Sequence, residues 1–158
     1  MTNEKIPTLY VWAGGLPTLE RLMVVFYDRV RQEPLLAPLF AHMDPDHPRI
    51  VAKFIAEVFG GPTLYSEERG GHHAMIMKHL GKRFTEAQRS RWMGLLLACA
   101  DEVGLASDPE FRSAFVAYLE WGTRLAVANS QTNELPAVNA AMPKWGWGET
   151  GGPYRAER

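Results

Sequence analysis

Residues 19–30, Leu-Glu-Arg-Leu-Met-Val-Val-Phe-Tyr-Asp-Arg-Val, carry apolar side chains at intervals of three and four residues. An α-helix turns once every 3.6 residues, so this spacing gathers the apolar side chains on one face. That face consists of Leu19, Leu22, Met23, Phe26, Tyr27 and Val30. The stretch therefore predicts an amphipathic helix that packs one face against the rest of the protein.

The same spacing recurs further along the chain. Two more apolar faces are formed by His47, Ile50, Val51, Phe54, Ile55 and Val58, and by Trp92, Leu95, Leu96, Cys99, Ala100 and Val103. Thr85-x-x-Gln88 forms a capping box ahead of the second of these. A fourth helix is expected after Asp108-Pro109, where Asp can cap and Pro fits the first turn. No stretch alternates long enough to predict a strand, so the predicted fold class is all-α.

Glycine and proline mark the expected breaks between helices. Gly14-Gly15 precedes the first helix, and Gly60-Gly61-Pro62 ends the second, because paired glycines allow positive φ and proline cannot continue a helix. Residues 63–73 are polar and predict a long loop, which leads into a short helix around Ala74 to His79.

The C-terminal part has a different composition. After Asn129 the chain is rich in proline and glycine, which cannot sustain a helix. We therefore divide the chain into a helical domain, residues 1–130, and a Gly/Pro/Trp-containing extension, residues 131–158. The extension is expected to be either draped over the body or disordered.

Composition excludes several classes of protein. The 158 residues are 46% hydrophobic and 22% charged, as expected for one globular domain. A net charge of -1 offers no general attraction to nucleic acid or to a membrane surface. No membrane-spanning run and no signal peptide are recognisable, so we expect a cytoplasmic protein. The single cysteine, Cys99, lies in an apolar run and is expected to be a packed core thiol.

Common catalytic motifs are absent from the sequence. There is no His-Glu-x-x-His zinc motif, no glycine-rich phosphate loop and no nucleophile elbow. His79 ends a short apolar run, and Tyr27, Trp92 and His47 lie on apolar helix faces. Each of these four alone has an ordinary structural explanation, as a cap or a core residue. Together they match a haem pocket, which needs one neutral imidazole on one side and a few donors in an apolar cavity on the other.

Several motifs in combination resemble those of a known protein family. They are Tyr10-Val11-Trp12-Ala13-Gly14-Gly15, Phe26-Tyr27-Asp28-Arg29-Val30, Pro38-Leu39-Phe40, Phe59-Gly60-Gly61-Pro62, Tyr65-Ser66, Met77-Lys78-His79 and Trp92. With these motifs the chain resembles a truncated haemoglobin, most closely one of group II, from about Tyr10 to Asn129. The resemblance implies a two-over-two helical sandwich around haem b.

The resemblance also implies roles for single residues. His79 falls on the proximal position, as the protein ligand to the iron, and no catalytic residue is assigned. The positions implied to contact the haem are Tyr27, Phe40, His47, Val51, Phe54, Tyr65, Met75, Lys78, Arg83 and Trp92. Among these, the resemblance makes Tyr27 and Trp92 donors to the bound ligand, Lys78 and Arg83 neighbours of the propionates, with Tyr65 a candidate to join them, and Phe54 and Met75 part of the ring lining.

His47 is the position at which the chain departs from many group II members, which carry a small residue there. Pro48 restricts the backbone of His47, so we expect the imidazole to point outward, or to alternate between the two orientations, and to act as a gate at the pocket entrance. An inward imidazole would instead be a third donor to the ligand.

Three functions remain open from the sequence. The first is a protein that binds oxygen, nitric oxide or carbon monoxide at a five-coordinate iron, for storage or for detoxification of nitric oxide, with a reductase that the sequence does not identify. The second is a haem peroxidase in which His47 moves protons. The third is a non-haem helical domain. The protein is expected to be a monomer or a homodimer.

Overall fold

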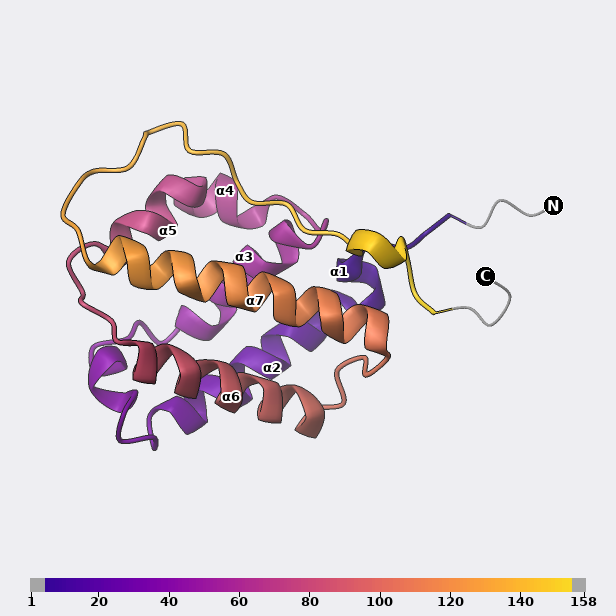
Figure 1. The fold of residues 1–158 in the computed structure, drawn as a ribbon, viewed down its shortest axis with the longest axis horizontal. Coiled ribbons are helices and arrows are strands. Elements are labelled where there is room, and N and C mark those ends of the chain that lie inside the picture. The colour runs from indigo at the N-terminus through magenta and orange to yellow at the C-terminus, as the bar shows by residue number, and fades with distance from the viewer. Residues whose placement is uncertain (1–4, 155–158) are drawn as a thin grey trace.

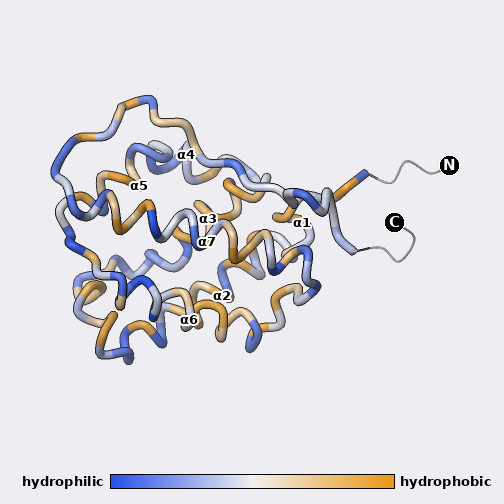
Figure 2. Tube along the Cα trace, in the orientation of Figure 1, coloured by the Kyte–Doolittle hydropathy of each residue, from blue (hydrophilic) through white to orange (hydrophobic). Residues whose placement is uncertain are grey.

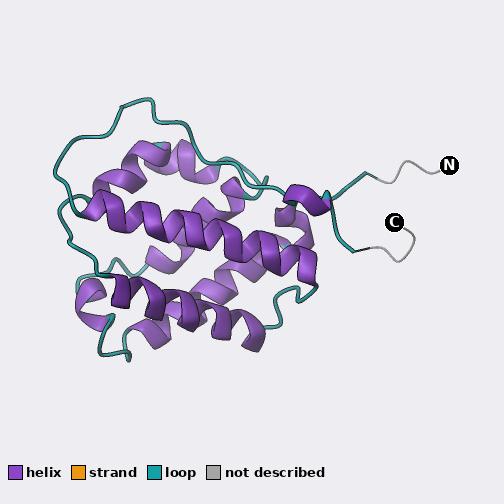
Figure 3. Ribbon diagram, in the orientation of Figure 1, coloured by secondary structure: helices purple, strands orange, loops and turns teal. Residues whose placement is uncertain are grey.

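The computed structural model describes residues 5–154, and no strand occurs among them. The α-helices are α1 (Leu9–Trp12), α2 (Gly15–Val30), α3 (His47–Val58), α4 (Leu64–Arg69), α5 (Gly71–His79), α6 (Glu86–Glu102) and α7 (Pro109–Ser130). Two short 3-10 helices are η1 (Ala37–Phe40) and η2 (Gly148–Thr150). The described chain is therefore all-α, as predicted (Figure 3).

The four long helices form two layers. In Figure 1, α6 and α7 lie in front of α2 and α3. Contacts join α2 to α3, α6 to α7 and α2 to α6. Polar and apolar residues alternate along each helix in Figure 2, as the packing of amphipathic helices requires. The core lies between the layers, where Leu19, Leu22 and Phe26 have no exposed surface.

The predicted starts of α6 and α7 and the predicted break after α3 are confirmed. The Thr85 hydroxyl accepts from Gln88 N at 3.1 Å, and the Gln88 side chain accepts from Thr85 N at 2.9 Å, which completes the capping box. The Asp108 carboxylate accepts from Phe111 N at 3.1 Å at the start of α7. Gly60, just beyond α3, has a φ of 92°, which favours glycine. These local signals therefore set the ends of the helices.

The prediction of a long loop over residues 63–73 is wrong. Helix α4 occupies most of this stretch, and α5 begins at Gly71 rather than at Ala74. The cause is a tertiary contact, because the buried carboxylate of Glu57 on α3 accepts hydrogen bonds from both the backbone N–H and the hydroxyl of Ser66. Gly70, with a φ of 94°, separates the two helices. Helix α1 was also not expected from the periodicity.

Residues 131–154 of the C-terminal extension are draped over the body. From the end of α7 it arches past α5 and α4 and returns to α1 (Figure 1). Trp145 N donates to Val58 O at 2.9 Å, and Trp147 Nε1 donates to Pro7 O at 2.8 Å. Of the two alternatives for the extension, the structure therefore shows the ordered one. Within the described residues no helix is long and apolar enough to cross a membrane.

Candidate functional site

Three of the predicted site residues meet at one end of the sandwich. Tyr27 on α2 is buried, and the rings of Phe40 and His47 lie against its ring. The Tyr27 and His47 centroids are 4.7 Å apart at 86°, and the Tyr27 and Phe40 centroids are 5.4 Å apart at 64°. The Phe40 and His47 centroids are separated by 5.9 Å. These three rings therefore form one aromatic group, although they come from α2, the end of η1 and the start of α3.

Trp92 on α6 adjoins this group from the other layer. Its ring lies 5.0 Å from that of Phe26, which packs at 4.9 Å against Tyr27. Burial raises the pKa of the Tyr27 hydroxyl, and a hydrogen bond with the Trp92 side chain opposes that rise only in part. The hydroxyl therefore keeps its proton and remains a donor.

The His47 imidazole lies inward in this structure, and not in the outward orientation expected from the sequence. Its ring packs on Tyr27, and its Nε2 is buried without a hydrogen-bond partner among the described residues. His47 is the first residue of α3, and Pro48 fits the first turn, so packing rather than the backbone decides where the side chain points. Burial lowers the pKa of His47 to about 4, with a further lowering by the charge of Lys78 and an opposing effect of Asp44. The imidazole is therefore neutral near pH 7.

His79 is the last residue of α5 and is half-buried. Its ring lies 5.7 Å from Phe84, and no described residue hydrogen-bonds its imidazole. Burial, followed by the charges of Lys78, His47 and His72, lowers the pKa of His79 to about 4. A neutral imidazole with an unshared nitrogen is suited to bind a metal ion.

The remaining predicted residues divide into lining and surface positions. Phe54 and Tyr65 pack at 4.9 Å and 90°, and the buried Tyr65 hydroxyl has no described partner. Val51 and Met75 are half-buried and pack against the core.

Two basic residues predicted for the site lie at the surface. The side chains of Lys78 and Arg83 are exposed, and neither forms an ion pair within the described part of the chain. Arg83 has a φ of 57°, and its backbone N donates to Ser130 O at 2.9 Å. The structure does not bring the Arg83 side chain into contact with the other predicted residues.

These residues fit haem rather than a bare metal ion. Among residues 5–154 no group of three or more His, Cys, Asp or Glu side chains could hold a metal ion. A single imidazole such as that of His79 holds a metal only when another group supplies the other ligands, as a porphyrin does. The unpartnered His47 Nε2 and Tyr65 hydroxyl, together with the half-buried Val51 and Met75, match a planar group with an apolar face and a polar edge.

Sequence reasoning missed two buried charges and one histidine. Glu57 and Arg89 are buried, and Arg89 links α6 to α7 through Glu86 and Glu120. His72, whose ring is 6.4 Å from Phe54, adds to the charges that act on His79. Apart from Glu86, three residues before Arg89 on α6, the partners Ser66, Glu120 and Phe54 lie on other helices, so local spacing does not reveal these contacts.

Comparison with known proteins agrees with this arrangement. The model of the bacterial-like globin family matches residues 8–122. The group 2 truncated haemoglobin YjbI of Bacillus subtilis is 31% identical over 122 residues, which cover 77% of this chain and 90% of that protein. The group 1 truncated haemoglobin GlbN of Nostoc commune is 36% identical over 89 residues, which cover 48% of this chain and 75% of that protein.

Solved structures show the same likeness. The truncated oxygen-avid haemoglobin of Bacillus subtilis is 31% identical with a TM-score of 0.68, and 77% of this chain and 99% of that chain are covered. The haemoglobin of Chloroflexus aurantiacus is 30% identical with a TM-score of 0.67, and 81% of this chain and 99% of that chain are covered. The chain belongs to the bacterial-like globin family, as a truncated haemoglobin of the group II type, and the cofactor of this family is haem with its iron.

Proposed function

We propose that this chain binds haem through His79 and retains oxygen, or another diatomic ligand, among Tyr27, His47 and Trp92. The observation that carries the proposal is the contact of His47 with Tyr27 at 4.7 Å, with the His47 Nε2 buried and unpartnered. An unpartnered buried polar atom costs free energy, so its persistence indicates a ligand that completes it.

Haem supplies an iron with one open position at which a diatomic molecule binds. Tyr27 would be a neutral donor toward that position, because burial keeps its hydroxyl protonated. The Trp92 indole N–H, which hydrogen-bonds Tyr27 in this structure, would be the second donor. His47 adds a third neutral group, which donates from Nε2 in one tautomer and accepts in the other. Each hydrogen bond contributes about 1 kcal/mol, roughly a factor of five in the release rate. Several donors therefore favour retention of the ligand over rapid delivery.

Slow release fits storage or detoxification of nitric oxide better than transport. In such a role the exposed Lys78 and Arg83 would neutralise the haem propionates, since neither has a carboxylate partner among residues 5–154. The Tyr65 hydroxyl, which is buried and unpartnered, would donate to the same polar edge.

The test of the haem ligand is His79→Gly. We expect the variant to lose stable haem binding, and added imidazole to restore the ferrous absorption spectrum by filling the space that the side chain leaves. His42→Gly is the control, because His42 is exposed and makes no contact among the described residues. A His79→Gly protein with an unaltered ferrous spectrum in the absence of imidazole would remove His79 as the ligand.

A second function, haem peroxidase, is favoured by the protonation state of His47. Its neutral imidazole, in the tautomer with the hydrogen on Nδ1, can take a proton from peroxide at Nε2. Peroxide-dependent oxidation of a reducing dye should then fall by at least tenfold in His47→Leu. Equal rates in the two proteins would leave ligand retention as the only function.

A further inference from the structure

The C-terminal extension is hydrogen-bonded to the helix that carries His79. His72 Nδ1 lies 3.1 Å from Ala141 O, and His73 Nδ1 lies 3.2 Å from Ala137 O. A carbonyl oxygen only accepts, so both imidazoles carry a hydrogen on Nδ1 and donate it. The two histidines form the first turn of α5, at the opposite end of the helix from His79.

The other end of α5 is held from the same direction. Gly81 N donates to Thr132 O at 2.9 Å, just beyond the helix. Gly81 has a φ of 69°, and a Cβ at this position would lie 2.5 Å from the Asn133 side chain. Only glycine therefore allows the Asn133 side chain to lie this close to the backbone of residue 81. Gln131 Nε2 donates to Phe84 O at 2.9 Å. The residues that follow α7 therefore bind both ends of α5.

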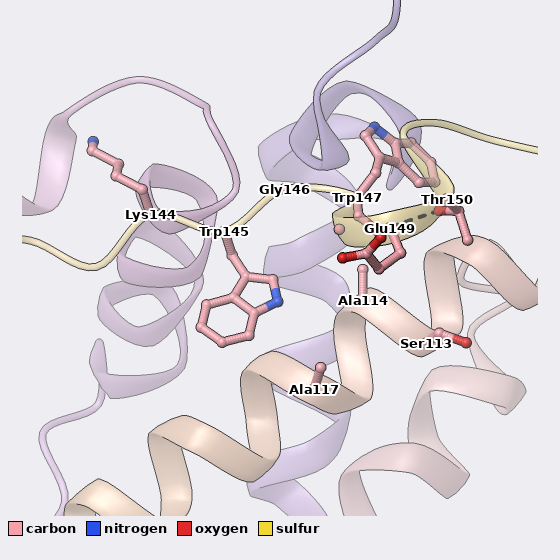
Figure 4. Close-up of a pocket in the computed structure, with 10 residues that line it drawn as sticks. Ser113, Ala114, Ala117, Lys144, Trp145, Gly146, Trp147, Glu149 and Thr150 are labelled. Carbon is pink, nitrogen blue, oxygen red and sulfur yellow. Dashed lines mark hydrogen bonds between the residues drawn. The ribbon is translucent and has the colours of Figure 1, made fainter.

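Two tryptophans fix the far end of this extension. The Trp145 ring lies 5.7 Å from that of Tyr118 and 5.8 Å from that of Trp121, both on α7. Figure 4 shows the Trp145 side chain directed toward α7 and Lys144 directed away from it. Here Trp145 and Trp147 line a shallow hollow of about 400 Å³ along α7.

Trp147 provides the second anchor. Its ring packs edge-on at 5.9 Å against Trp12 and lies 6.4 Å from Phe111, and its Nε1 donates to Pro7 O. Aromatic pairs of this kind contribute about 0.5–1.5 kcal/mol each beyond the area that they cover. The extension is therefore fixed at the end of α7 and again at residues 145–147.

Helix α5 contacts α4 and α7, but no fully buried side chain anchors it in the core. None of its residues is fully buried, whereas α2, α3, α6 and α7 each bury several side chains in the core. A helix with few buried contacts opens readily, and its position depends on the remaining hydrogen bonds. The hydrogen bonds that α5 side chains donate run from His72 and His73 to the extension.

We propose that residues 131–147 form a strap that holds α5 in place and so sets the position and orientation of His79. His72 and His73 are positioning residues, which act on the iron ligand through the helix that they share with it. The strap rests on the proposed function only in the role given to His79, because its contacts with α5 do not involve the haem. It lies beyond residues 8–122, the part that the globin family model matches.

The first experiment measures hydrogen exchange in the full-length, haem-containing protein. In the double variant His72→Phe/His73→Phe we expect the α5 amides to exchange about fivefold faster for each hydrogen bond lost, while α2 and α6 stay unchanged. The variant His72→Asn/His73→Asn keeps a side-chain N–H near each Nδ1 and should restore protection. His42→Phe is the matched control on an exposed histidine.

Trp145→Ala loosens the strap at a residue outside α5, which is one ring removed from His72 through Trp121. We expect it to speed α5 exchange as the double variant does. Unchanged α5 exchange in both the double variant and Trp145→Ala would overturn the strap.

The second experiment addresses the positioning of His79. The iron–histidine stretching band of the ferrous, ligand-free protein reports the geometry of that bond, and we expect it to shift in His72→Phe/His73→Phe and to return in the asparagine pair. Faster α5 exchange with an unshifted band would show a strap that does not position His79, and would overturn that part of the proposal. An unaltered ferrous spectrum of His79→Gly in the absence of imidazole would instead refute the proposed iron ligand and leave the exchange result intact.

Discussion

Replacing His47 tests whether its imidazole donates a hydrogen bond to the bound ligand or acts as a gate at the pocket entrance. His47→Leu removes both ring nitrogens and keeps a side chain of similar bulk against Tyr27, whose ring lies 4.7 Å away, and against Phe40, 5.9 Å away. His47→Gln is the matched control, because its amide can still donate to a ligand. The pair therefore tests hydrogen bonding with little change in the space that a ligand must cross.

The expected magnitude follows from one neutral hydrogen bond. Its loss costs the ligand about 1 kcal/mol, so oxygen should leave His47→Leu about five times faster than it leaves the unmodified protein or His47→Gln. Since Tyr27 and Trp92 remain, the effect should not exceed roughly tenfold. Burial lowers the pKa of His47 to about 4, so it stays neutral above that value and the release rate should be flat from roughly pH 6 to pH 8.

Stopped-flow displacement of oxygen by carbon monoxide gives the release rate, and flash photolysis gives the entry rate. Unchanged release in His47→Leu together with faster entry would identify a gate and refute the inward donor. A release rate that falls or rises near pH 6.5 would show that the imidazole is not desolvated as the structure has it.

The remaining predictions concern the other donors and the fold. Tyr27→Phe and Trp92→Phe should each speed oxygen release, and the double variant should depart from additivity because both serve one ligand; stopped-flow release rates check this, and two unchanged single variants would contradict it. Glu57→Leu leaves the Ser66 N–H and hydroxyl without their acceptor and should lower the free energy of unfolding by about 1–3 kcal/mol in urea titration. Thr85→Ala removes the N-cap of α6 and should cost about 1 kcal/mol in the same assay.

The sequence predicts the long helices because their signals are local. Apolar periodicity places residues 19–30 within α2, and the Thr85 and Asp108 caps set where α6 and α7 begin. Helix α4 was missed because the acceptor that organises it, Glu57, lies on another helix. The course of the extension depends in the same way on pairs far apart in the chain, such as Trp147 and Pro7. Polarity and composition do not report such contacts.

The candidate site was only partly predictable, for a related reason. The resemblance to truncated haemoglobins singles out His79 and Tyr27, whereas residue type and spacing alone leave each with an ordinary structural explanation. The direction of the His47 side chain depends on a choice between a backbone restriction and the packing of a ring. Pro48 acts on the backbone of its neighbour alone, and the imidazole is free to rotate about its own side-chain bonds. Contact with Tyr27 and burial from water then decide the orientation.

The two sides of the pocket are held by different means. Tyr27 lies on a helix with several residues in the core, whereas His79 lies on α5, which has no fully buried residue. A donor fixed by the core keeps its geometry when α5 moves, whereas the proposed bond from His79 to iron would not. Variants of the strap should therefore change the iron–histidine band while leaving hydrogen bonding to the ligand intact, and variants at Tyr27 or Trp92 should do the reverse. A ligand-release rate and an iron–histidine frequency that always changed together would show that α5 and the distal helices move as one body.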